Sequence, residues 1–456
     1  MKATFRRNLR RLFCGILIFC QLGAVTAYAK PDWPADTGIL AEAGVVMDID
    51  SGAVLISQNG HVAYPPASIT KLLTALIVLE HAGLEETVTY SETAVNSVEA
   101  DSGNKLSLTA GDTLTVEECL YVLLLVSSNQ TANALAEHVA GSISGFVDMM
   151  NEKLAELGCT ESHFDNPSGL NGDTQYVSAL DMARIAQAAY QNETLLAINS
   201  ADSYQIGPTI NNPDGASAVN EHRLVITEDP ANEYYCPAAK AGKTGYLLAA
   251  GNTLVTYGEQ DGRRLVSVIL KGSPRQYFLD GKNLLEFGFG NFKNMEISGN
   301  ETRYVTGQEP VDINGASYQP EQLAIEPGKV ITLPNTAAFS DAELSLEPVP
   351  DGAPVGCVGL LSYSYNDRKI GSAYLMTKEG LAALEDSSGE SGALENEGNA
   401  GESGAEGTAG AGNTVGDDSA AGAGNGAEDG NAAGAENGIG ENGAGEPAEP
   451  VNGAAD

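Results

Sequence analysis

The sequence predicts an α+β protein that continues into a small all-β domain and ends in a disordered acidic tail. Three observations support this prediction. Two strand pairs lie far apart in the chain, at residues 43–57 and 251–270, and the segment between them has helical periodicity. Residues 294–378 contain short strand patterns broken by Gly and Pro. Residues 379–456 are dominated by Gly, Ala, Glu and Asn, a composition that cannot offset the entropy of ordering the chain.

The individual elements follow from local patterns. Residues 43–50 and 53–57 are apolar runs separated by turn residues, which predicts two strands. A helix is expected from about Ser68 to Gly83, because apolar residues recur there at three- and four-residue spacing. The other expected elements are helices within 115–155, 176–190 and 277–287, and strands at 251–257, 264–270, 356–363 and 370–376.

The first 29 residues have the pattern of a secretory signal peptide. A basic region precedes a short apolar run at residues 12–25, and Ala27-Tyr28-Ala29 fits a cleavage site. The run is too short for a comfortable membrane span, so we expect export and cleavage, with an uncleaved N-terminal anchor as the alternative.

Charge and cysteine content exclude several classes of function. The formal net charge is −37, and the residues from Glu385 onward contribute 16 acidic side chains and no Lys or Arg. Nucleic acid is excluded as a partner because phosphate binding needs clustered cations, and a basic patch for anionic lipid is excluded for the same reason.

Four cysteines follow the signal segment: Cys119, Cys159, Cys236 and Cys357. Their wide spacing fits neither a zinc site nor a small disulfide scaffold. Cys119 lies in an apolar helical pattern, which favours a buried free thiol. One disulfide among the four cysteines is also compatible with the sequence, which does not indicate a pairing. The five histidines form no H-E-x-x-H motif, and we expect no metal and no cofactor.

Ser68 and Lys71 form an S-x-x-K pattern at the predicted start of a helix. Positions three apart share a helical face, so the lysine amine can reach the serine hydroxyl. Serine needs such an adjacent base to become a nucleophile, and a helix N-terminus favours the negative charge that develops. The pattern also occurs at Ser102 and Lys105, but no helix pattern follows there, and we expect loop and strand instead.

Two further patterns are ambiguous when each is taken alone. Ser127-Ser128-Asn129 follows a buried helix and is consistent with a simple helix cap. Lys243-Thr244-Gly245 precedes a predicted strand and is consistent with a lysine that protects an exposed sheet edge. Together with Ser68 and Lys71, however, they complete the ordered set S-x-x-K, S-x-N and K-T-G of penicillin-recognising serine enzymes.

Three segments of the sequence, including these motifs, resemble segments of a known family. Residues 66–75 resemble the nucleophile segment of the low-molecular-mass penicillin-binding proteins, the serine D-Ala-D-Ala carboxypeptidases of peptidase family S11. Residues 164–170 resemble that family's F-x-N-P-x-G-L loop, and residues 241–252 resemble its third motif. The similarity covers roughly residues 38–292, and the following β region resembles the family's C-terminal stalk more loosely.

The resemblance implies the domain organisation. A serine β-lactamase/penicillin-binding-protein-like catalytic domain is expected at residues 30–293, with an antiparallel sheet flanked by helices and a helical subdomain. The small β domain then spans residues 294–378. The implied partners are peptidoglycan stem peptides that end in D-Ala-D-Ala, with β-lactam antibiotics as inhibitors. The implied location is the cell wall or the outer face of the cytoplasmic membrane, or the medium after release.

The resemblance also implies residue roles in acyl transfer. Ser68 attacks the carbonyl of the terminal peptide bond, and Lys71 accepts its proton. Ser127 relays a proton to the leaving amine, and Asn129 holds the substrate amide and Lys71.

The remaining implied residues bind the substrate. Lys243 and Thr244 hold its terminal carboxylate, and Arg275 is a weaker third candidate. Gly245 belongs to the same segment, and the backbone N–H groups of Tyr246 and the nucleophile form the oxyanion hole.

The chain departs from the family in two places. Gln175 stands where the family often has a histidine, so no role for that histidine is transferred. The acidic tail contains no amphipathic or spanning anchor, which leaves the mode of membrane contact open.

Two alternative functions remain. A serine β-lactamase shares the fold and motifs, but its deacylating glutamate lies four residues before an asparagine, whereas Glu161 and Asn166 are five apart. A non-catalytic β-lactam-sensing or wall-binding module is the second alternative, and the three intact motifs favour an enzyme over it.

Overall fold

The computed structural model describes residues 30–99 and 102–394. The predicted signal peptide and most of the predicted acidic tail therefore lie outside the described residues.

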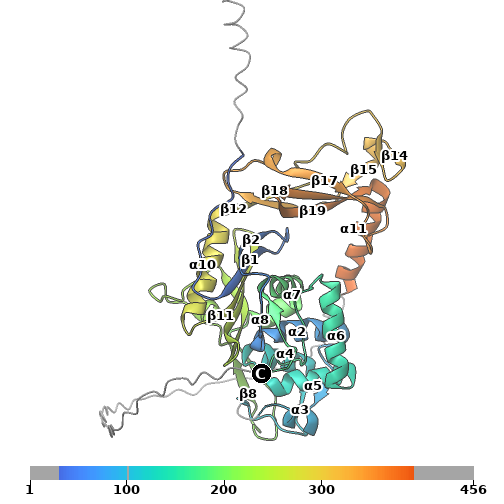
Figure 1. Ribbon diagram of the computed structural model, residues 1–456. Helices are drawn as coiled ribbons and strands as arrows, with labels where there is room; N and C mark the ends of the chain where they lie inside the picture. Colours follow the sequence, from blue (N-terminus) through green and yellow to red (C-terminus); the bar gives the residue numbers. More distant parts are fainter. Residues whose placement is uncertain (1–29, 100–101, 395–456) are drawn as a thin grey trace, which may run out of the picture. The chain divides into compact units, whose positions relative to one another are not determined.

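A five-stranded antiparallel sheet forms the centre of the first part of the chain (Figure 1). Its strand order is β2-β1-β11-β10-β9. The bounds are β1 (Ala43–Asp48), β2 (Val54–Gln58), β9 (Ala239–Leu247), β10 (Gly251–Gln260) and β11 (Arg263–Gly272). The two predicted strand pairs are confirmed, and β1 pairs with β11 from Ala43 opposite Leu270 to Asp48 opposite Leu265. This pairing joins the beginning and the end of the catalytic sequence in one sheet.

Strand β9 was not predicted, because we expected Lys243-Thr244-Gly245 to precede a strand. In the structure these residues lie inside β9, which pairs with β10 along its length. Most residues of β9 are Ala, Gly or Lys, which have little β propensity, so its extended form depends on the neighbouring strand.

The two faces of the sheet are covered by different helices. Along β11, Val266 and Val268 belong to the hydrophobic core shared with the helical region. Leu265 and Ile269 belong to a second core that includes residues of α10 (Gln276–Asn291). This alternation is expected of a strand buried on both faces, because successive side chains point to opposite sides.

The helical region is built around α2, which is buried from Lys71 to Val78. The preceding 3-10 turn is η1 (Ala67–Thr70), so the predicted helix start is confirmed within a residue or two. The helices are α2 (Lys71–His81), α3 (Glu92–Asn96), α4 (Val116–Leu125), α5 (Asn129–Ala140), α6 (Ile143–Glu156), α7 (Ala179–Gln191), α8 (Glu193–Asn199) and α9 (Arg223–Ile226). No helix within residues 30–99 and 102–394 is both long and apolar enough to cross a membrane.

Short two-stranded ribbons connect these helices. They are β3 (Ala63–Tyr64) with β6 (Val177–Ser178), β4 (Thr87–Thr89) with β5 (Thr113–Thr115), and β7 (Ser203–Ile206) with β8 (Ala216–Val219). The four cysteines are free thiols, and Cys119 is fully buried, as predicted from its apolar helical setting.

The chain after α10 forms β structure, as predicted. Its main sheet has the order β15-β19-β18-β17, and β12 pairs with β16 and β13 with β14. The bounds are β12 (Phe292–Glu296), β13 (Val311–Ile313), β14 (Ala316–Tyr318), η2 (Pro320–Gln322), β15 (Leu323–Ile325), β16 (Val330–Pro334), η3 (Phe339–Asp341), β17 (Glu343–Glu347), β18 (Cys357–Tyr365) and β19 (Arg368–Thr377). The domain boundary predicted at residue 293 falls within β12 and stays a prediction.

One difference concerns the start of the predicted tail. Helix α11 (Lys378–Leu394) occupies residues for which we expected no ordered structure. Its first turn packs against the β region, because Gly380 lies so close to Gly356 that a Cβ on either would meet the other's Cα within 2.6 Å. This contact continues the fold beyond residue 378.

Candidate active site

Ser68 and Lys71 lie one turn apart where η1 continues into α2. The Lys71 Nζ donates a hydrogen bond to the Ser68 Oγ at 3.0 Å. Two other acceptors hold the same ammonium group: the Asn129 Oδ1 at 2.8 Å and the Ser168 carbonyl oxygen at 2.5 Å. The S-x-x-K spacing therefore brings the amine to the hydroxyl, and two distant segments fix its direction.

The environment of Lys71 favours its neutral form. The side chain is completely buried. Burial lowers the pKa of Lys71 well below its usual value, and the positive charges of Lys243 and Lys105 lower it further. A lysine that is neutral for part of the time can accept the proton of the hydroxyl it contacts.

The loop at residues 164–170 supports this turn from one side. Thr74 of α2 donates to the Pro167 carbonyl oxygen at 2.7 Å. Gly169 has a φ of +85°, and a Cβ there would lie 1.9 Å from the Ala67 carbonyl oxygen. Glycine is therefore required at this position both by the backbone conformation and by the close approach to the turn at residues 67–70, which carries Ser68.

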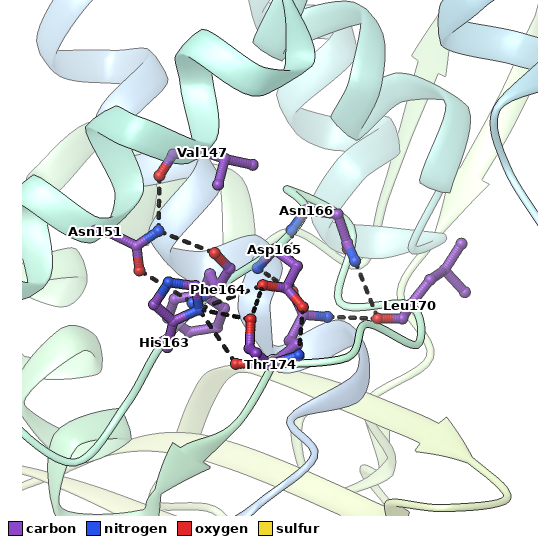
Figure 2. A network of polar contacts seen from close by, with 9 residues as sticks. Val147, Asn151, His163, Phe164, Asp165, Asn166, Leu170 and Thr174 are labelled. Carbon is purple, nitrogen blue, oxygen red and sulfur yellow. Dashed lines mark hydrogen bonds and ion pairs between the residues drawn. The ribbon is translucent and has the colours of Figure 1, made fainter.

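A network of polar contacts holds the loop in shape (Figure 2). The Asn151 side chain brackets Phe164, donating to its carbonyl oxygen at 2.9 Å and accepting from its N–H at 3.1 Å. Gln175, the residue that replaces the family's histidine, is buried. Its Oε1 accepts from the N–H groups of Asp165 and Asn166, and its Nε2 donates to the Leu170 carbonyl oxygen at 2.5 Å. Gln175 thus connects both ends of the loop.

The S-x-N segment divides into a capping residue and two pocket residues. Ser128 caps α5 by accepting from the Thr131 N–H at 3.1 Å, as the cap interpretation expected. Ser127 has a φ of +64°, a strained conformation for serine, and lines a pocket together with Asn129.

Strand β9 forms the opposite wall of that pocket. Gly245 lies against the turn that carries Ser68, since a Cβ there would be 2.9 Å from the Ser68 nitrogen. Lys243 is only 2% exposed, so it does not act as a solvent-exposed guard of the sheet edge. Burial lowers the pKa of Lys243 to about 7, the Glu221 carboxylate opposes this shift, and the Lys105 charge adds to it.

The pocket has a volume of about 450 Å³. It is lined by Ser68, Ser127 and Asn129 of the predicted set together with Thr244, Gly245 and Tyr246, and Lys71 and Lys243 are buried beside it. Arg275 does not line it. This exposed residue has a φ of +66° and precedes α10, so the structure does not support it as a carboxylate-binding residue.

Several residues line the pocket that the sequence did not identify as binding residues. They are Glu99, Ser102, Lys105, Gly169, Leu170, Glu221, Leu247, Leu248, Asn252 and Tyr277. Ser102 and Lys105 had been set aside as a chance S-x-x-K match. As expected, no helix follows them, but their loop borders the same pocket as Ser68.

Ser68 and Ser102 differ in the hydrogen-bond partner of the side-chain hydroxyl. Within the described part of the chain, the Ser102 Oγ is buried without a hydrogen-bond partner. The amine of Lys105 bonds instead to Glu221. Across the described residues, no cluster of His, Cys, Asp or Glu side chains could hold a metal ion.

Comparisons with known proteins agree with the resemblance. A family model described as D-alanyl-D-alanine carboxypeptidase, peptidase S11, matches residues 28–273. The D-alanyl-D-alanine carboxypeptidase DacB2 of Mycobacterium tuberculosis is 35% identical over 265 residues, which are 57% of this chain and 84% of that protein. DacF of Bacillus subtilis is 29% identical over 296 residues, 63% of this chain and 72% of that protein.

Solved structures show the same fold. Penicillin binding protein 5 from Haemophilus influenzae aligns with a TM-score of 0.61 and 25% identity. The alignment covers 75% of this chain and 98% of that one. The predicted fold class is confirmed.

Proposed function

The chain belongs to the D-alanyl-D-alanine carboxypeptidase family, and from this premise we propose that Ser68 is the nucleophile of its reaction. The observation that carries the proposal is the 3.0 Å contact between the Lys71 Nζ and the Ser68 Oγ in a pocket bounded by β9. Neutral Lys71 accepts the hydroxyl proton while the Ser68 Oγ attacks the carbonyl carbon of the terminal D-Ala–D-Ala bond.

The negative oxygen that forms in this step requires hydrogen-bond donors. We assign them to the backbone N–H groups of Ser68 and Tyr246, because Gly245 allows β9 to approach the nucleophile turn closely. Each such donor typically contributes about 10²–10³ in rate. Ser127 relays the proton to the leaving nitrogen, and D-alanine departs. Water then hydrolyses the ester, which releases the shortened peptide and returns a proton to the serine.

The substrate, location and inhibitors follow from the same assignment. The substrates are peptidoglycan stem peptides that end in D-Ala-D-Ala, and Lys243 and Thr244 bind the terminal carboxylate. β-Lactams acylate Ser68 in place of the peptide. The enzyme is exported by its signal peptide and acts outside the cytoplasm, where these peptides occur.

Turnover of two substrates tests this function against its main alternative. Purified protein is expected to release D-alanine from a D-Ala-D-Ala peptide at a rate far above its hydrolysis of nitrocefin. Glu161 supports this expectation, because it is bonded to His61 at 3.0 Å and does not line the pocket. Rapid nitrocefin turnover would establish a β-lactamase, and acylation without turnover of either substrate would establish a sensing module.

The two buried lysines predict a bell-shaped pH dependence of kcat/KM. Lys71 must be neutral to act as a base, so the rate falls as the pH drops below its lowered pKa. Lys243 must be charged to bind a carboxylate, so the rate also falls as the pH rises through about 7. Lys243→Arg, which keeps its charge, is expected to move the alkaline limb to higher pH. An alkaline limb that stays at the same pH in this variant would contradict the assignment to Lys243.

A further inference from the structure

An ion pair joins two segments, distant in the sequence, that both line the pocket. Lys105 lies in the loop before β5, and Glu221 lies in the loop before α9. The Lys105 Nζ donates to both carboxylate oxygens of Glu221, at 2.5 and 2.6 Å. Both residues line the pocket together with Thr244. The charges of this pair therefore act directly on any ligand that the pocket binds.

Lys105 is the accessible cation among the three lysines that interact around the pocket. Lys71 is buried and already holds three acceptors. Lys243 is buried as well and donates to the Thr244 carbonyl oxygen at 3.0 Å. The Lys105 side chain, in contrast, is 52% exposed. Its positive charge also lowers the pKa of both other lysines, so its ammonium group lies within electrostatic reach of each.

The Glu221 carboxylate interacts with two of these lysines. It bonds to Lys105, and its charge raises the pKa of Lys243. A substrate carboxylate bound by Lys243 and Thr244 would carry the same charge in the same part of the pocket. Glu221 and the substrate therefore compete for one cationic environment.

We propose that Lys105 binds the terminal carboxylate of the substrate by exchanging Glu221 for it, and that Glu221 is an internal competitor. This inference rests on the proposed function and adds a specificity-determining residue to it. Breaking the Lys105–Glu221 pair costs little free energy, because both side chains are about half exposed and such pairs are only weakly stabilising. Lys105 thereby becomes the third residue, besides Lys243 and Thr244, that binds the terminal carboxylate, the role for which Arg275 was the sequence-based candidate.

A purely structural bridge would behave differently. If the pair only held the two loops together, removing either partner would break the same contact and change activity in the same direction. If Glu221 competes with the substrate, removing Lys105 weakens carboxylate recognition and removing Glu221 strengthens it. The sign of the two effects therefore separates the two explanations.

The measured quantity is the ratio of kcat/KM for a D-Ala-D-Ala peptide to kcat/KM for the same peptide with a C-terminal carboxamide. Any effect that acts through the basicity of Lys71 changes both rates and cancels in this ratio. The assay is run at pH 6, below the pKa of about 7 of Lys243, so that this lysine is charged in the wild-type protein.

We expect Lys105→Met to lower the ratio about threefold to tenfold, and Lys105→Arg to restore most of it. Glu221→Gln is expected to raise the ratio about twofold. Lys240→Met and Glu233→Gln remove the same charges at exposed positions that do not line the pocket, and they should leave the ratio unchanged.

Two results would overturn the inference: an unchanged ratio in Lys105→Met, or a fall of the ratio in Glu221→Gln as well. Thermal unfolding of each variant identifies any loss of folding, and the direction of the change in Glu221→Gln keeps the inference testable if the methionine variant does not fold. Failure of the proposed function gives a separate result, because the wild-type protein would then release neither D-alanine from the acid peptide nor D-alanine amide from the carboxamide peptide.

Discussion

Ser68→Ala is expected to abolish both covalent labelling by a fluorescent penicillin and the release of D-alanine. Among the described residues, Ser68 supplies the only hydroxyl that accepts from the Lys71 amine, and its removal leaves no group there that can form the acyl ester. The other two acceptors are a side-chain amide and a backbone carbonyl. Loss of a catalytic nucleophile typically lowers kcat by about 10⁴-fold or more, so the remaining rate should fall below detection. The variant should still fold, because the Ser68 hydroxyl makes no other hydrogen bond within the described residues.

Ser102→Ala is the matched control, because Ser102 has the same motif and borders the same pocket. Its hydroxyl has no hydrogen-bond partner in the described part of the chain, and its motif lysine is bonded to Glu221. We therefore expect labelling close to that of the wild type. Labelling that survives in Ser68→Ala and disappears in Ser102→Ala would show that the nucleophile had been assigned to the wrong serine.

The sequence predicted those elements of the fold whose hydrophobic pattern is strong. The pair β10 and β11 follows from two apolar runs separated by turn residues, and the helix α2 follows from helical periodicity. Both patterns depend only on neighbouring residues. Strand β9 was missed because most of its residues are Ala, Gly or Lys, which show no strand pattern, and its conformation is imposed by pairing with β10. Helix α11 was missed for a similar reason, since its first turn is stabilised by contact with the β region.

The same distinction applies to the site. Ser68 and Lys71 could be found because their geometry is set by spacing within one turn. Lys105 and Glu221 are 116 residues apart, and only the folded chain brings them together at the pocket. Arg275 is a weaker candidate that the family resemblance implies, but the exposed turn before α10 leaves it outside the pocket lining.

Gly169→Ala is expected to damage the active site although residue 169 carries no functional group. The new Cβ would lie 1.9 Å from the Ala67 carbonyl oxygen and 2.8 Å from the Thr70 Oγ1, so the loop and the nucleophile turn must separate by about 1 Å. The neighbouring Ser168 carbonyl oxygen, which accepts from Lys71, would move as well. A displacement of this size in a catalytic group costs about 10²-fold in rate, and we expect acylation by penicillin to slow by that factor.

Gly141→Ala separates the close contact from the backbone conformation. Gly141 ends α5 with a φ of +72°, and a Cβ there would meet nothing within 4 Å. Both variants place alanine in the left-handed region, which costs about 1–2 kcal/mol of unfolding free energy. Gly169→Ala should lose more than this in urea denaturation, whereas Gly141→Ala should keep the wild-type acylation rate. Equal losses of stability together with normal acylation in both variants would mean that the loop does not hold the nucleophile turn in place. Slow acylation in Gly169→Ala alone would instead show that the reactivity of Ser68 depends on a close backbone contact that only glycine permits.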